Sequence, residues 1–232
     1  MSQQFFMDLE ARIAKYDLLC HPFYKAWADG ELTQEDLREY ACDYYHHVAA
    51  FPTYLAEFGI RLDDGELRRA VLANMSDEKG GEDVYGDPAA SHADLWLDFV
   101  EGMGSTRDQR THQALPEVMA LMNFFHRAAG ELSPAEALAA FYAYESQVPR
   151  IASEKARGLR EQYGANEKTC AYFTLHETAD VYHSQVWKQQ LSREIAAYPD
   201  SAQKALASAE AAAKALWTAL DGIEQRRMAK AA

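Results

Sequence analysis

The sequence predicts an all-α protein. Apolar residues recur with helical periodicity through almost all of the 232 residues, and no segment shows the convincing alternation of apolar and polar residues that marks a half-buried strand. Two segments also begin with helix N-terminal signals, Thr33-Gln34-Glu35-Asp36 and Ser133-Pro134-Ala135-Glu136, in which a hydroxyl residue precedes acid in the first turn. We find neither an internal repeat nor a linker, so we expect one helical-bundle domain over residues 1–232.

The expected elements follow in chain order. The first helices cover about residues 3–16, a short segment from His21 to Trp27 that stops near Gly30, a long segment that begins at Thr33 and that Pro52 should kink, and residues 65–79. The clearest loop is 80–91, rich in Gly, Asp and Pro, and its Ser91 is expected to cap a helix that starts near His92. Further helices are expected over 107–130, interrupted at Pro116, and over 134–163, 166–198 and 201–227, the last of them alanine-rich.

Charge and cysteine content narrow the partners and the compartment. The formal net charge is -13, and such a surface repels phosphate backbones and anionic lipid, so we expect no nucleic-acid and no membrane partner. No apolar run approaches the roughly 20 residues of a membrane span, and the N-terminus carries no secretory signal. The three cysteines, Cys20, Cys42 and Cys170, form no metal-type pairs and fit a reducing cytoplasm.

The segment from Leu175 to Trp187 suggests a metal site. At about 100° per residue, His176, Asp180 and His183 fall within roughly a 60° arc of one helix, and the apolar Leu175 and Ala179 lie near that arc. The arc should therefore face the core, where unpartnered imidazoles and a carboxylate would cost several kcal/mol. A divalent transition metal such as Fe, Mn or Zn would satisfy them. A hydrogen-bonded Asp–His pair is the alternative.

Other helices offer matching residues. Glu145 lies in an otherwise apolar and aromatic helix face, Glu78 ends a helix with apolar positions, and His92 begins a segment that turns Trp96 inward. Together with His176, Asp180 and His183, these residues make three carboxylates and three histidines on four predicted helices. Carboxylate and histidine ligands that project from several helices into a bundle core are typical of dimetal proteins, although the Glu-x-x-His pairs of ferritin-like proteins are absent.

Three motifs carry a family resemblance. The helix Tyr142-Ala-Tyr-Glu-Ser-Gln-Val-Pro149, the Asp77-Glu78 pair followed by His92-Ala-Asp-Leu-Trp96, and the histidine–aspartate helix resemble the haem-oxygenase-like dimetal oxidases of the TenA/PqqC superfamily. Within it, the chain is most similar to the proteins related to the chlamydial protein associating with death domains, over residues 5–220. The resemblance implies a haem-oxygenase-like helical bundle. It places the six metal ligands at Glu78, His92, Glu145, His176, Asp180 and His183, with Glu82 as an alternative first carboxylate.

The resemblance also implies a reaction. The subgroup makes para-aminobenzoate for folate synthesis in an O2-dependent oxidation at an Fe/Fe or Fe/Mn centre, with an external reductant. One of the protein's own tyrosines supplies the ring and a lysine supplies the amino group, so each chain reacts about once. The matching positions here are Tyr24 and Lys155.

Three further tyrosines are candidates from their positions alone. Tyr172 precedes His176 by four residues and is adjacent to it on a helix, Tyr144 adjoins Glu145, and Tyr40 shares a helical face with Tyr44. Phenols beside an oxygen-activating metal pair are oxidisable, so Tyr40, Tyr144 and Tyr172 are expected to tune or relay oxidation.

The alternatives are two kinds of metal-free enzyme and a non-enzymatic interaction protein. A thiaminase-like hydrolase would use Cys42 or Cys170 as nucleophile, and a cofactorless oxidase of the pyrroloquinoline-quinone type would need a basic anion pocket, of which this acidic chain shows little sign. An interaction protein would use a surface such as the alanine-rich last helix, which could pack on a partner or on a second copy. We expect the protein to form a homodimer.

Overall fold

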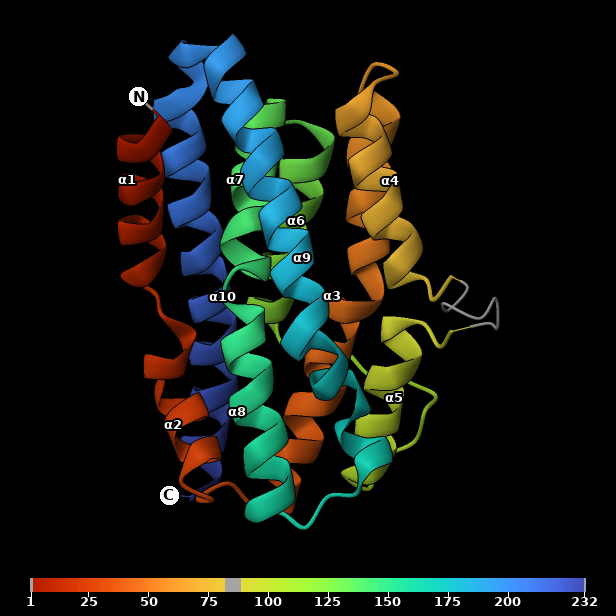
Figure 1. Ribbon diagram of the computed structural model, residues 1–232. Helices are drawn as coiled ribbons and strands as arrows, with labels where there is room; N and C mark the ends of the chain where they lie inside the picture. The colour runs from red at the N-terminus through yellow and green to blue at the C-terminus, as the bar shows by residue number, and fades with distance from the viewer. Residues whose placement is uncertain (1, 82–88, 232) are drawn as a thin grey trace.

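The computed structural model describes residues 2–81 and 89–231, and within these ranges every regular element is helical (Figure 1). The helices are α1 (Ser2–Ala14), α2 (Pro22–Ala28), α3 (Gln34–Arg61), α4 (Glu66–Glu78), α5 (His92–Gly102), α6 (Pro116–Gly130), α7 (Pro134–Glu145), α8 (Val148–Glu161), α9 (Glu167–Ala197) and α10 (Ala202–Ala231), with short 3-10 helices at Leu18–Cys20 and Pro199–Ser201. The predicted all-α class is confirmed.

The predicted helix starts are confirmed by their caps. Thr33 and Ser133 both form capping boxes: the side-chain hydroxyl accepts the backbone N–H of the residue three positions later, and the backbone N–H of the cap residue donates to that residue's carboxylate. The Ser91 side chain accepts the backbone N–H of Asp94 and so caps α5 at His92. These local hydrogen bonds depend on few residues, which is why sequence alone finds them.

Two of the predicted helices are wrong in extent. The helix expected over 107–130 begins only at Pro116, because proline prefers the first turn, where its missing N–H is not needed. The helix expected over 134–163 is two helices, α7 and α8, separated at Ser146 and Gln147. Pro149 lies in the first turn of α8, and a proline there prevents α7 from continuing. Helix α3, by contrast, runs without interruption through Pro52.

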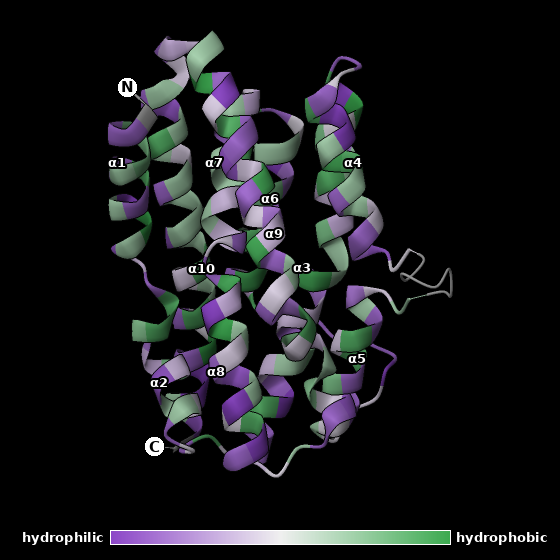
Figure 2. Cartoon of the chain, in the orientation of Figure 1, coloured by the Kyte–Doolittle hydropathy of each residue, from purple (hydrophilic) through white to green (hydrophobic). Residues whose placement is uncertain are grey.

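The long helices pack side by side around an aromatic core. Helix α7 packs against α9 and α10, and α3 packs against α4, α5 and α6, as Figure 1 shows. Hydrophobic and hydrophilic residues alternate around the helices (Figure 2), as a bundle of amphipathic helices requires. Of the helices in the described ranges, none is both long enough and apolar enough to cross a bilayer.

Candidate metal centre

One face of α9 carries the two histidines and the aspartate into the core. The side chains of His176, Asp180 and His183 are 3%, 2% and 4% exposed, so the predicted arc does face inward. One reason given for that prediction is wrong, because Leu175 is 37% exposed. Aromatic side chains lie on the same face of α9, and they end with the fully buried Trp187, four residues beyond His183.

The structure brings all six predicted ligands together in two clusters. The first contains Glu78, His92 and His176, and the second contains Glu145, Asp180 and His183; within each, one ligand atom per residue lies within 4.8 Å of the others. The residues come from α4, α5, α7 and α9, so no short stretch of sequence contains the site. Glu82, the alternative first carboxylate, lies outside the described residues.

The donor set fits a pair of metal ions. His92 Nδ1 lies 2.9 Å from a Glu78 oxygen but is not aligned for a hydrogen bond, as expected where both atoms face a shared cation. Burial, followed by the charge of Asp180, raises the pKa of Glu145 well above its usual value, since buried carboxylates repel one another. A cation would relieve that repulsion, and a mixed set of imidazole nitrogens and carboxylate oxygens suits iron or manganese.

Two buried donors fix the orientation of Glu145. Trp187 Nε1 donates to one carboxylate oxygen at 2.6 Å, and Asn74 Nδ2 donates to the other at 3.2 Å. Such partners orient a ligand and adjust its basicity. Sequence reasoning missed both. The position of Trp187 one turn after His183 was a usable signal, whereas nothing in the sequence relates Asn74 to Glu145.

The histidines of α9 are oriented by their second nitrogens. His176 Nδ1 lies 2.7 Å from the backbone carbonyl of Tyr172, so it donates there and leaves Nε2 for a metal. His183 Nε2 lies 3.1 Å from Asp77, and its Nδ1 lies 3.3 Å from Asp180. Burial by itself lowers the pKa of His183, but the hydrogen bond to Asp180 and the nearby carboxylate charges raise it to about 10. Asp77 is a further residue that sequence reasoning did not assign a role.

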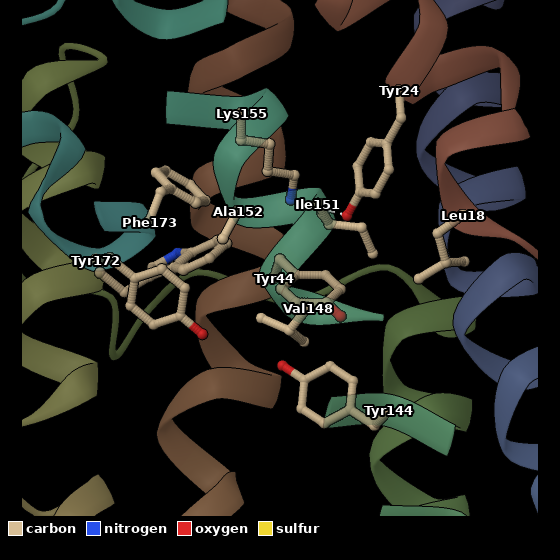
Figure 3. Close-up of a pocket in the computed structure, with 11 residues that line it drawn as sticks. Leu18, Tyr24, Tyr44, Tyr144, Val148, Ile151, Ala152, Lys155, Tyr172 and Phe173 are labelled. Atoms are coloured by element: carbon tan, nitrogen blue, oxygen red, sulfur yellow. Dashed lines mark hydrogen bonds between the residues drawn. The ribbon is translucent and has the colours of Figure 1, made fainter. Parts of the chain in front are cut away.

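A tyrosine and a lysine meet in a second pocket. Lys155 on α8 is 5% exposed, and its Nζ donates to the hydroxyl of Tyr24 at 2.8 Å and also to the hydroxyl of Tyr40. The two phenol oxygens lie 3.1 Å apart. Figure 3 shows Lys155 and Tyr24 pointing toward each other. Burial lowers the pKa of Lys155 well below its usual value, which favours a neutral amine with a free lone pair.

Tyr144 and Tyr172 line both pockets. They border the pocket that holds Tyr24 and Lys155, and also the pocket that holds the ligands Glu78, Glu145, His176 and Asp180. In Figure 3 their hydroxyls point into the pocket that holds Tyr24 and Lys155. The ring of Tyr172 also stacks on His176 with centroids 4.0 Å apart. The two tyrosines therefore separate the predicted metal ligands from the tyrosine–lysine pair. Tyr44 and Trp96 line the Tyr24 pocket too, and sequence reasoning gave neither a role.

The approach of α2 to α8 brings Tyr24 to Lys155. Trp27 Nε1 on α2 donates to the backbone carbonyl of Lys155 at 3.3 Å. One turn further along α8, Gly158 faces the same indole, and a Cβ there would lie 2.8 Å from Trp27 Cδ1. The absence of a side chain at this position allows the two helices to touch.

Gly158→Ala is expected to lower the stability by about 1–3 kcal/mol, because the added methyl group overpacks a rigid indole. It should also separate Tyr24 from Lys155 and so reduce the reaction that the family resemblance implies for this pair. Thermal unfolding and product yield measure the two effects. Gly130→Ala is the matched control, since a Cβ there meets nothing within 4 Å. Equal behaviour of the two variants would contradict the packing role.

The cysteines do not support a nucleophile. Cys42 and Cys170 are both buried, and burial raises the pKa of each thiol. The Cys42 thiol donates to the Ser105 hydroxyl at 3.3 Å, whereas an activated thiol needs a basic or cationic neighbour that lowers its pKa. The thiaminase-like alternative loses its proposed nucleophiles.

Comparison with known proteins agrees with this geometry. Residues 38–217 match the model of a family described as iron-containing redox enzymes. The chain is 39% identical to a 4-aminobenzoate synthase of Chlamydia muridarum, over 96% of this chain and 91% of the relative, and 35% identical to a 4-aminobenzoate synthase of Nitrosomonas europaea, over 95% and 91%. Among solved structures it resembles a domain of unknown function with a heme oxygenase-like fold from Shewanella denitrificans, with a TM-score of 0.80 and 18% identity over 96% of this chain and 93% of that one.

Proposed function

The chain belongs to the family of iron-containing redox enzymes, and we propose that it forms 4-aminobenzoate in an O2-dependent oxidation of its own Tyr24, with Lys155 as the amino donor. The metal ligands would be Glu78, His92, His176, Glu145, Asp180 and His183, holding Fe/Fe or Fe/Mn. Bound metals of this kind would supply the activation of O2, with an external reductant providing electrons.

The contact between Lys155 and Tyr24 carries the proposal. A lysine amine in an aromatic core is costly to bury, and its Nζ lies 2.8 Å from the Tyr24 hydroxyl and 4.2 Å from the centre of that ring. Because the lowered pKa favours the neutral amine, the nitrogen is a nucleophile held beside the ring carbon that bears the phenol oxygen. This arrangement places the amine nitrogen of Lys155 beside the aromatic ring of Tyr24 that it would aminate.

The product fixes which bonds change. In 4-aminobenzoate, nitrogen and a one-carbon carboxylate lie para to each other, as the hydroxyl and Cβ do in tyrosine. A bond therefore forms between Nζ of Lys155 and Cζ of Tyr24, and the Cζ–Oη bond breaks, with the phenol oxygen leaving as water. The Nζ–Cε bond of Lys155 also breaks, and Cε leaves as an aldehyde after oxidation by O2 and hydrolysis. The Cα–Cβ bond of Tyr24 also breaks, and Cβ becomes the carboxyl carbon.

The other tyrosines shape the space around this pair. The Tyr40 hydroxyl lies 3.1 Å from that of Tyr24 and is the other acceptor of the Lys155 amine, so it holds both reacting groups. Tyr144 and Tyr172 stand between the pair and the metal ligands. From that position their phenols can relay oxidation from one pocket to the other.

Tyr24→Phe is expected to abolish 4-aminobenzoate formation, because the variant lacks the oxygen-bearing ring carbon that receives the nitrogen. The protein is incubated aerobically with Fe(II), Mn(II) and ascorbate without an added aromatic substrate. Product is then measured by mass spectrometry, and peptide mapping should show a mass loss at Tyr24 of the wild type.

Tyr198→Phe is the matched control, because Tyr198 is 64% exposed, and it should keep the full yield. Undiminished product from Tyr24→Phe, or product from a wild type whose Tyr24 stays intact, would refute the proposal.

A further inference from the structure

A buried histidine outside both pockets has no role in the reaction described above. His47 is 0% exposed, and its Nε2 has no hydrogen-bond partner among the described residues. Burial lowers its pKa to about 3, so the ring is neutral. A buried polar atom without a partner costs about 1–3 kcal/mol, and an apolar side chain would fill this aromatic space without that cost.

His47 belongs to a continuous series of aromatic contacts. Its ring centroid lies 5.2 Å from that of Tyr144, and its Nδ1 lies 3.5 Å from the hydroxyl of Tyr54. The ring of Tyr54 meets that of His126 edge-on, with centroids 4.6 Å apart. His126 Nδ1 in turn lies 2.9 Å from a Glu57 oxygen.

The series runs from the metal pocket to solvent. Tyr144 borders the metal ligands, Tyr54 is 0% exposed, and the side chains of His126 and Glu57 are 38% and 37% exposed. His47, Tyr54 and Glu57 lie at intervals of seven and three residues on α3, and so share one helical face. That face meets Tyr144 of α7 and His126 of α6.

The side chains in the series are those that can exchange electrons and protons. A phenol gives up an electron when its proton has an acceptor, and an imidazole accepts and returns a proton. The phenylalanines that surround the series, such as Phe51 and Phe125, can do neither. A chain of residues with this chemistry, between an oxidising pocket and the surface, can carry electrons inward from the surface to a tyrosine that has been oxidised in the pocket.

We propose that Tyr144, His47, Tyr54 and the His126–Glu57 pair form an electron path, by which a small one-electron donor of the enediol class, such as ascorbate, quenches oxidation that reaches Tyr144. This inference rests on the proposed function, which supplies the oxidant, O2.

The transfers balance in two steps. In the first, a Tyr144 phenoxyl takes one electron from Tyr54 and takes back the proton that Tyr144 released when it was oxidised, while the phenolic proton of Tyr54 crosses to His47 Nδ1. In the second, ascorbate gives one electron to the Tyr54 phenoxyl at the His126–Glu57 surface and leaves as the ascorbyl radical, losing its proton to solvent. The proton then returns from His47 to Tyr54.

Oxidation mapping of the metal-loaded protein tests the path. After exposure to O2 without ascorbate, peptide mass spectrometry of the wild type should find oxidation at Tyr54 and His126, and added ascorbate should suppress it. In Tyr54→Phe, oxidised His126 should be lost. His112 is the internal comparison, because its side chain is similarly exposed, at 31%, but it lies outside the series. The variant removes only a hydroxyl, and its melting curve checks the fold.

Two results would overturn the path: His126 oxidised to the same degree in Tyr54→Phe and wild type, or no more than His112 in the wild type. Either can occur while the wild type still forms 4-aminobenzoate, which separates failure of the path from failure of the proposed function. A wild type that forms no product and shows no oxidation would overturn both.

Discussion

Lys155→Met should abolish 4-aminobenzoate formation and at the same time stabilise the protein. Methionine fills a similar volume but has no amine to transfer. The two phenols that Lys155 contacts, Tyr24 and Tyr40, keep each other as partners at 3.1 Å, so no hydroxyl is orphaned. Replacing a buried ion pair by apolar residues of similar volume often stabilises a protein by up to about 4 kcal/mol, and Lys155 is a buried amine without even an acidic partner among the described residues to offset its desolvation. In a chain of this size, melting temperature rises about 2–4 °C for each kcal/mol.

The sign of the stability change depends on pH. Burial lowers the pKa of Lys155 in the folded state, whereas the unfolded lysine has a pKa of about 10.4. Below that value the unfolded chain binds a proton that the folded chain does not, so Lys155 destabilises the fold as pH falls. The gain from methionine should therefore be larger at pH 7 than at pH 10.

Lys25→Met is the matched control, because Lys25 is exposed on α2 beside Tyr24. It should change neither product yield nor melting temperature. A Lys155→Met protein that still makes the product would exclude lysine as the donor. One that melts at a lower temperature than the wild type would show that the buried amine stabilises the fold.

Metal removal should have the second large effect, on stability as well as on activity. A ligand present at 1,000 times its Kd stabilises the folded state by about 4 kcal/mol, which corresponds to a rise of roughly 8–16 °C for one site in a chain of this size. Thermal unfolding of the apo protein under nitrogen, with and without Mn²⁺, measures this. An unchanged melting temperature would argue against a metal centre.

Asp180→Asn tests whether the second cluster binds metal. Asp180 contributes to the second cluster, so the variant should retain less metal in elemental analysis and lose product formation. In the apo protein the change removes the charge that most disfavours ionised Glu145, but it also removes the carboxylate that hydrogen-bonds His183 and raises its pKa. Asp64→Asn, at a carboxylate whose side chain is 90% exposed, should alter neither property. Metal content and product yield equal to those of the wild type would contradict a role for Asp180 as a ligand.

Local sequence was enough where few residues decide the structure. The caps at Thr33, Ser91 and Ser133 follow from spacing alone, as does the grouping of His176, Asp180 and His183 on one face of α9. The division at Ser146–Gln147 and the late start of α6 were missed, because a helical pattern of apolar residues continues across a proline even when the backbone cannot. Glu78 lies at a helix end, where acids are commonly exposed, and its burial depends on its contacts with His92 of α5 and His176 of α9.

The sequence by itself determined the all-α class and, through its motifs, the six residues that gather into two clusters. The tertiary structure decided what those residues adjoin. It joined Asn74 and Trp187 to Glu145, and brought Lys155 to Tyr24 across 131 positions of chain. It also aligned His47 and Tyr54 between Tyr144 and the surface. Periodicity reports which side of a helix faces inward, but which helices meet on that side depends on packing between residues far apart in the chain.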